Sequence, residues 1–377
     1  MTTTKSDTGL FSPVVPEDRW HPDFRALREE SPREPARRSM EGVFARMGDR
    51  DGNFREQFQT TGFDSRVWEL YLYAALEDVG LEIRQPNPAP DFLVRRGSLT
   101  FGIEATTANL RTGESKPVIS NKRELLEFLT QELPIRLGSP LFSKLQTNYT
   151  AKPELRGVPF VLALECFVSP DSMFVSESPL GSYLYGLHSS PEFDHDKKLR
   201  IRNTTIGEHR SGEKVIPSGF FAQPGAEEIS AILFSNSGTA GKFSRMGYQA
   251  GIAQDRIWMG RYGMVANNNP DAAAPSFFAE EVGNRTERWS EGLVVFHNPQ
   301  AARPLPDEAF GYAAVQYALV DGEIRHTISP FHVFSSQTLT IPAPEGYGVE
   351  VARFIGIRRL RELAEGMEAT YGAKSSD

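Results

Sequence analysis

Apolar residues recur with a helical period between residues 65 and 79, the first strongly patterned segment of the chain. The apolar positions stand at i, i+4, i+7, i+8 and i+11 and are Trp68, Leu72, Ala75, Leu76 and Val79. This spacing predicts an amphipathic helix with one apolar face. Asp64 or Ser65 is a suitable N-cap, and Gly80 suits the residue after the last turn.

Short apolar runs follow this helix and predict a sheet. The expected elements are strands at 81–84, 91–95 and 99–106, helices at about 120–133 and from 143 to 149, and a strand at 158–168. Pro86, Pro88 and Pro90 end the first strand, and the turn Arg96-Gly97-Ser98 makes the next two strands a hairpin. The run at 158–168 is nearly all apolar, which is typical of a central strand covered on both faces. The order helix, strand, strand, strand, helix, strand predicts an α/β fold.

The remaining pattern divides the chain into three parts. Residues 1–60 are rich in proline and charge and predict an arm with short helices, and residues 61–170 form the core described above. Residues 171–377 predict a large α+β C-terminal elaboration packed on that core. Its expected elements are strands at 229–234, 292–296 and 313–319 and a helix at 349–369, with long loops at about 170–228 and 260–290.

Composition excludes several classes of protein. The chain has 377 residues, 39% of them hydrophobic and 24% charged, which is ordinary for a soluble globular protein. A net charge of −8 argues against a general nucleic-acid coat protein but allows a local basic groove. Cys166 is the single cysteine, so neither a disulfide framework nor a cysteine-based zinc site is possible. We expect a cytoplasmic protein with no membrane partner, since the N-terminus has no apolar signal core and no run approaches the ~18 apolar residues of a membrane span.

Three acids stand within otherwise apolar segments. Asp91 opens one strand of the predicted hairpin, Glu104 lies within the next strand, and Glu69 lies in the amphipathic helix. Burying a carboxylate costs free energy unless a partner compensates it, and a divalent metal ion is a common partner. Two carboxylates suffice for Mg²⁺, which prefers oxygen ligands and retains several waters.

Pro90-Asp91, followed thirteen residues after Asp91 by Glu104-Ala105-Thr106, resembles the PD-(D/E)XK superfamily of restriction-endonuclease-like nucleases. The resemblance covers about residues 63–168 and implies an αβββαβ core. It implies that Asp91 and Glu104 bind Mg²⁺, for which Mn²⁺ substitutes, and that Glu69 corresponds to the glutamate of the family's first core helix. The implied activity is metal-dependent hydrolysis of phosphodiester bonds, in DNA rather than RNA, within bacterial defence or DNA processing. A homodimer or a partner protein of a defence system is the implied assembly.

The second motif departs from the family pattern, because Thr106 stands where the lysine is expected. Some members supply this lysine from the following helix, and Lys144 is the best replacement, ahead of Lys122 and Lys152. Gln146 and Tyr149 lie in the same segment and resemble the substrate-binding Gln and Tyr of the exonuclease-like branch. If no lysine reaches the acids, the protein is a degenerate nuclease that acts as a binding module.

Other segments offer weaker candidates. Lys242 and Arg245 follow the small-residue loop 235–241, which lacks the Walker frame but can contact phosphate through N–H groups, and we predict that both bind substrate. Arg-Tyr pairs among glycines at 245–248 and 260–263 are either turns or part of a substrate groove. The histidines near the acidic segment 192–196 match no metal-binding spacing and indicate a solvated loop. A different hydrolase, dependent on His297 or Ser237, stays open as an alternative.

Overall fold

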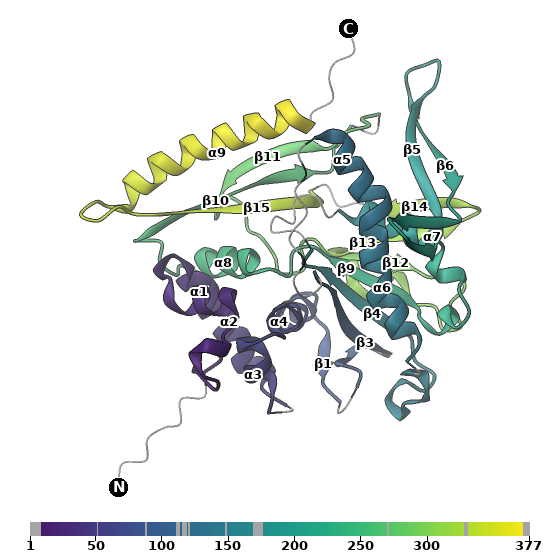
Figure 1. Ribbon diagram of the computed structural model, residues 1–377, viewed down its shortest axis with the longest axis horizontal. Helices are drawn as coiled ribbons and strands as arrows, with labels where there is room; N and C mark the ends of the chain where they lie inside the picture. The colour runs from purple at the N-terminus through teal and green to yellow at the C-terminus, as the bar shows by residue number, and fades with distance from the viewer. Residues whose placement is uncertain are drawn as a thin grey trace.

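An eight-stranded mixed sheet organises the described part of the protein (Figure 1). The structure is a computed structural model and describes residues 9–50, 52–86, 89–110, 114, 119, 121–147, 149–168, 176–269, 271–327 and 331–371. The strands, in their order across the sheet, are β1 (Glu82–Arg84), β2 (Phe92–Arg96), β3 (Leu99–Ala108), β4 (Phe160–Cys166), β9 (Ala231–Ser235), β12 (Val294–His297), β13 (Val315–Val320) and β14 (Glu323–Thr327). β3, β4 and β9 run parallel to one another, and β1, β2 and β3 form an antiparallel meander.

The predicted order of core elements is observed. Helix α4 (Phe63–Asp78) precedes the β1–β2–β3 meander, a long helical segment follows β3, and β4 then pairs in parallel with β3. The prediction of a mixed α/β protein is therefore confirmed. The sheet continues from β4 to β9, so its hydrogen bonding extends without interruption into the part of the chain beyond residue 170.

Side chains on β4 explain why this strand is central. Val161 and Ala163 face the helices α2 (Glu34–Met47) and α4, whereas Leu162 and Leu164 face α6 (Leu133–Leu145) and α7 (Glu177–Tyr185). All four side chains are fully buried. Helices therefore cover both faces of the sheet, as expected for a strand without alternating polar positions.

The helical segment after β3 is longer than the sequence predicts. α5 (Lys122–Glu127) passes through a π-helical turn (Phe128–Glu132) into α6, so neither Pro134 nor Pro140 ends the helix. Pro134 lies just after the π-helical turn, where the i→i−4 hydrogen-bond pattern is already interrupted. Gly138 lies against Tyr183 of α7, whose ring would be 2.5 Å from an added Cβ. The glycine thus permits close helix packing and does not mark a loop.

The N-terminal segment packs against the body of the protein. Leu10 and Phe24 are fully buried in the same hydrophobic cluster as Trp68 of α4. Its helices are α1 (Pro22–Glu29), α2 and α3 (Phe54–Gln59).

Both predicted long loops are wrong in their described parts. Residues 176–228 contain α7 and two hairpins, formed by β5 (Leu187–Phe193) with β6 (Leu199–Thr205) and by β7 (Glu208–Ser211) with β8 (Lys214–Pro217). The β5–β6 hairpin projects from the body of the protein, and most of its side chains are exposed (Figure 1). The β7–β8 hairpin packs against the helical segment through His209, whose ring contacts the Thr130 carbonyl oxygen.

The second loop region contains strands of a separate sheet. β10 (Ile257–Val265) lies between β11 (Ser276–Glu281) and β15 (Val333–Pro342), and α9 (Val349–Tyr371) covers this sheet (Figure 1). Gly263 lies within β10, where an added Cβ would meet the Ser335 carbonyl oxygen at 2.1 Å. The glycines at 260 and 263 therefore serve close packing rather than turns. α8 (Ala240–Gln249) packs closely on α2 at Gly247, where an added Cβ would lie 2.1 Å from the Pro35 carbonyl oxygen.

Candidate metal and nuclease site

Asp91 and Glu104 face each other across the β2–β3 hairpin. Asp91 directly precedes β2, and the register pairs the next residue, Phe92, with Ile103. Asp91 Oδ2 accepts a hydrogen bond from the Ala105 N–H at 2.8 Å, and Glu104 Oε2 accepts one from the Asp91 N–H at 3.3 Å. The hairpin register therefore fixes the two carboxyl groups side by side.

Lys144 reaches this pair from the last turn of α6. Its Nζ lies 2.7 Å from Glu104 Oε1, and the Tyr149 hydroxyl donates to the same oxygen at 3.0 Å. Glu104 is only 7% exposed, so this pair is well shielded from water. Burial opposes the Lys144 ammonium, but the Glu104 carboxylate outweighs it and raises the pKa of Lys144. Lys144 is therefore charged across the physiological pH range.

Glu69 lies near the pair but has its own partner. Arg66 Nη1, one turn earlier in α4, lies 2.6 Å from Glu69 Oε2. Burial raises the pKa of Glu69 above its usual range, although Arg66 partly offsets this effect. Sequence analysis missed Arg66, although its i, i+3 spacing from Glu69 is the spacing of a helical ion pair.

The electrostatics of the site disfavour a charged Asp91. Burial, the Glu104 carboxylate and the Glu69 carboxylate together raise the pKa of Asp91 from 3.8 to about 7. The hydrogen bond that Asp91 accepts from the Ala105 N–H lowers the pKa only in part. A bound cation would reverse this shift, because it favours the charged form of a nearby carboxylate.

The donor set fits a hard divalent cation held by two carboxylates. Asp91 and Glu104 supply only oxygen ligands, as Mg²⁺ and Mn²⁺ prefer. Glu69 does not complete a compact three-carboxylate cluster with them, since no set of three oxygens, one from each acid, lies within 4.8 Å of one another. The structure thus supports Asp91 and Glu104 as direct ligands more strongly than Glu69.

The predicted substrate-binding residues occupy different environments. Tyr149 is buried against Glu104, whereas Gln146 is exposed at the end of α6. Burial and the Glu104 carboxylate raise the pKa of Tyr149 to about 12, so its hydroxyl stays protonated and donates. Lys242 is fully buried 2.7 Å from Glu287, so it cannot contact a substrate in this conformation.

Arg245 belongs to the same buried charge cluster as Lys242. Its guanidinium contacts Glu287 at 2.8 Å and the Thr338 hydroxyl at 2.6 Å. Arg261 of β10 also lies in this cluster, with its Nη1 2.5 Å from Glu291 Oε1. The prediction that residues 260–263 form a turn or part of a substrate groove is therefore wrong, because they belong to a strand and Arg261 is buried. The residues of this cluster hold α8 to the second sheet.

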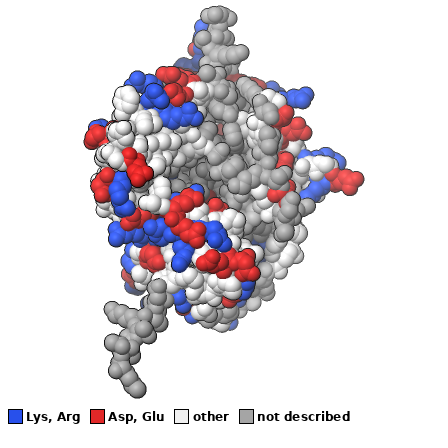
Figure 2. Space-filling view, turned by 60° about the vertical axis from the view of Figure 1, so that its left-hand side comes forward, with Lys and Arg blue, Asp and Glu red and all other residues white. Residues whose placement is uncertain are grey.

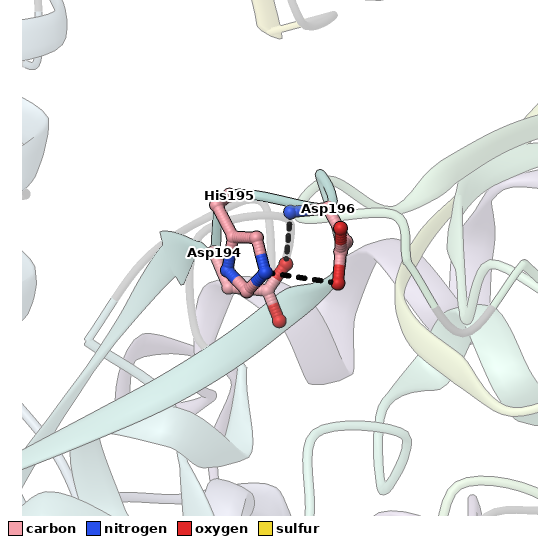
Figure 3. Close-up of side chains that lie close together, drawn as sticks. All are labelled: Asp194, His195 and Asp196. Carbon is pink, nitrogen blue, oxygen red and sulfur yellow. Dashed lines mark hydrogen bonds and ion pairs between the residues drawn. The ribbon is translucent and has the colours of Figure 1, made fainter.

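Three side chains in the β5–β6 turn lie close enough to hold a cation, and they form the one such group within the described ranges (Figure 3). They are Asp194, His195 and Asp196. Asp194 Oδ1 already accepts the N–H groups of Asp196 and Lys198 at 3.0 and 2.9 Å. The His195 side chain is 88% exposed. Asp194 thus closes the hairpin turn, which agrees with the interpretation as a solvated loop.

The geometry does not favour a hydrolase that combines His297 with Ser237. His297 pairs with Ala231 at one end of β9, whereas Ser237 follows the other end, six residues further along the chain. At about 3.3 Å per residue the two side chains are roughly 20 Å apart.

No protein-family model, curated protein or solved structure matches this chain significantly. The described residues include no helix with both the length and the apolar character that crossing a membrane requires.

Proposed function

We propose that the protein is a metal-dependent nuclease of the restriction-endonuclease-like class, with its active site at Asp91, Glu104 and Lys144. The observation that carries the proposal is the 2.7 Å contact between Lys144 Nζ and Glu104 Oε1. A lysine from the following helix occupies the role that Thr106 leaves vacant in the strand.

Each residue has a distinct task in this proposal. Asp91 and Glu104 hold Mg²⁺ or Mn²⁺, which when bound stabilises negative charge on the phosphate and activates water. Lys144 keeps an ammonium beside the phosphate and offsets its charge. The Tyr149 hydroxyl fixes the orientation of Glu104, and Arg66 holds Glu69 at the edge of the site.

DNA is the proposed substrate, and recognition depends on local rather than overall charge. On the face shown in Figure 2, acidic and basic side chains are interspersed and form no continuous basic surface. A non-specific phosphate-binding protein would need such a surface. Because the whole chain also has a net charge of −8, we expect modest affinity for DNA in the absence of metal.

A catalytically inactive binding module is the second candidate. Its support is that Lys144 and Tyr149 both bond to Glu104 Oε1. These two bonds could leave the acid satisfied without metal.

The deciding experiment is calorimetric titration of Mn²⁺ and Mg²⁺ into the wild type and an Asp91→Ala/Glu104→Ala double variant. Cleavage of plasmid and single-stranded DNA is measured on the same samples. The nuclease predicts metal binding and cleavage that are both lost in the double variant. A wild type that binds no Mn²⁺ and cuts nothing would refute the nuclease and leave the binding module.

A further inference from the structure

A cavity of about 570 Å³ lies at the carboxyl ends of the three parallel strands. Asn109 follows β3, Cys166 ends β4, and Thr239 lies between β9 and α8, and all three line the cavity. In open sheets with parallel strands, ligands bind in the crevice outside these ends. The Asp91–Glu104 pair does not line this cavity, so it is a separate site.

One wall of the cavity collects hydrogen-bond donors around Gly241. An added Cβ at Gly241 would lie 3.2 Å from Thr338 Oγ1, 3.5 Å from Thr239 Oγ1 and 3.7 Å from Arg245 Nη1. Arg245 is only 4% exposed, and its ion pair with Glu287 fixes its guanidinium at this wall. The missing side chain of Gly241 thus leaves space beside one cationic and two hydroxyl groups.

The first turn of α8 adds backbone donors to the same wall. The Thr239 side chain does not cap this turn, and the Thr239 carbonyl oxygen already accepts the Lys242 N–H at 3.0 Å. The N–H groups of Ala240 and Gly241, which precede Lys242, have no intrahelical acceptor. Together with Arg245, this wall suits a group with several anionic oxygens.

Other lining residues have different chemistry. Asp23 and Asp64 are among them, and their carboxylates accept hydrogen bonds from hydroxyl or amino groups. His21 also lines the cavity, and its ring stacks on the buried Phe63 ring, with centroids 4.7 Å apart and planes 6° apart. The face of His21 that Phe63 does not cover can stack on a nucleobase.

We propose that this cavity binds a phosphate-bearing nucleotide, with the phosphate at Gly241 and Arg245 and the nucleoside against His21 and the two aspartates. The cavity volume lies within the range of about 300–1,000 Å³ typical of small-ligand sites. A free nucleotide and the 5′-terminal nucleotide of a strand share this chemistry. The inference does not depend on hydrolysis at Asp91 and Glu104.

The test measures binding by calorimetry in EDTA, so that no strand is cut. The probes are adenosine 5′-monophosphate, adenosine, inorganic phosphate, and an adenine pentanucleotide with and without its 5′-phosphate. Gly241→Val fills the space at the donor wall. Gly42→Val is the matched control, because it changes a glycine of α2 whose nearest neighbour is the flexible end of Arg46 at 3.9 Å.

We expect the nucleotide to bind the wild type at least tenfold more tightly than adenosine. Gly241→Val should weaken nucleotide binding at least tenfold, whereas Gly42→Val and Asp91→Asn should change it less than twofold. If Gly241→Val does not fold, Thr239→Val removes one hydroxyl of the wall and should weaken binding several-fold.

Binding of the phosphorylated pentanucleotide as tight as that of the mononucleotide would identify a strand end as the ligand. Weaker binding by at least tenfold would identify a free nucleotide. The proposal is overturned if neither phosphorylated probe binds, if adenosine binds as tightly as its monophosphate, or if folded Gly241→Val binds like the wild type. Because EDTA removes metal chemistry, failure here is distinguishable from failure of the nuclease proposal.

Discussion

Proton-linked metal binding is the sharpest consequence of the site geometry. Burial and two neighbouring carboxylates raise the pKa of Asp91 to about 7, so the carboxylate that we propose as a metal ligand is largely protonated at pH 6. A metal ion must displace that proton. For one proton with this pKa, apparent Mn²⁺ affinity should fall about tenfold from pH 8 to pH 6 and about tenfold again by pH 5.

Calorimetry in two buffers with different ionisation enthalpies measures both quantities. Wild-type protein should release close to one proton per Mn²⁺ at pH 6 and almost none at pH 8. Asp91→Asn is the matched variant and should bind Mn²⁺ weakly at every pH. An Mn²⁺ affinity that stays constant between pH 6 and pH 8 would refute the electrostatic reasoning for Asp91.

The same pKa makes a prediction for the metal-free protein. The pKa of Asp91 is near 3.8 in the unfolded chain and about 7 in the folded protein, so between these pH values the folded state binds the proton more tightly. The stability that this proton contributes is complete below pH 3.8 and is lost as the pH rises to about 7. The difference between the two values corresponds to roughly 4 kcal/mol as an upper bound, because Asp91 is only half-buried. Asp91→Asn should therefore be more stable than the wild type at pH 8, by about 1–4 kcal/mol, and equal to it near pH 4. Urea unfolding at both pH values checks this, and equal stabilities at pH 8 would contradict it.

Two further substitutions test the two charge clusters. Lys144→Met should lower DNA cleavage by about 10²–10³-fold while Mn²⁺ still binds, whereas the control Lys152→Met should change neither cleavage nor binding. Cleavage assays and Mn²⁺ titration of both variants test this prediction. Undiminished cleavage by Lys144→Met would exclude a catalytic role for this lysine. Glu287→Gln should destabilise the fold by about 3–5 kcal/mol, because it removes the carboxylate that buried cations share. Glu281→Gln, which loses a pair with a half-exposed arginine, should cost at most about 1 kcal/mol in urea unfolding, and similar losses in both variants would contradict the difference in burial.

The hairpin and its acids could be predicted from sequence because local pattern determines them. The alternation in 99–106 and the turn at Gly97 set the register, and the register alone brings Asp91 opposite Glu104. Local pattern does not determine the position of Lys144, because this position depends on α6 running unbroken through Pro140, and proline in a helical pattern favours a break.

Long-range packing hid the rest of the fold. Gly260 and Gly263 are spaced like turn residues, but β10 needs them because neighbouring groups occupy the space of a side chain. Lys242 follows a small-residue loop, as a phosphate-binding lysine can, but in the folded protein it is buried and pairs with Glu287, 45 residues later in the chain. The helical pair of Arg66 with Glu69 was visible in sequence, but whether that pair faces solvent or a carboxylate cluster was not.

The charge clusters around Glu287 and Asp91 shift the pKa of their carboxyl groups in opposite directions, and this difference separates a structural role from a chemical one. Around Glu287, Arg245 and Lys242 outweigh the cost of burial and hold the pKa of the carboxyl group well below its usual range. Around Asp91, the neighbouring Glu104 adds to the effect of burial, and the pKa rises instead. Glu287 therefore stabilises the folded protein as an anion, whereas ionised Asp91 destabilises it until a cation arrives. A fold gains no stability from an ionised carboxylate in this second situation, and an unfavourable position of this kind is typical of functional sites, which is consistent with the metal site that we propose at Asp91.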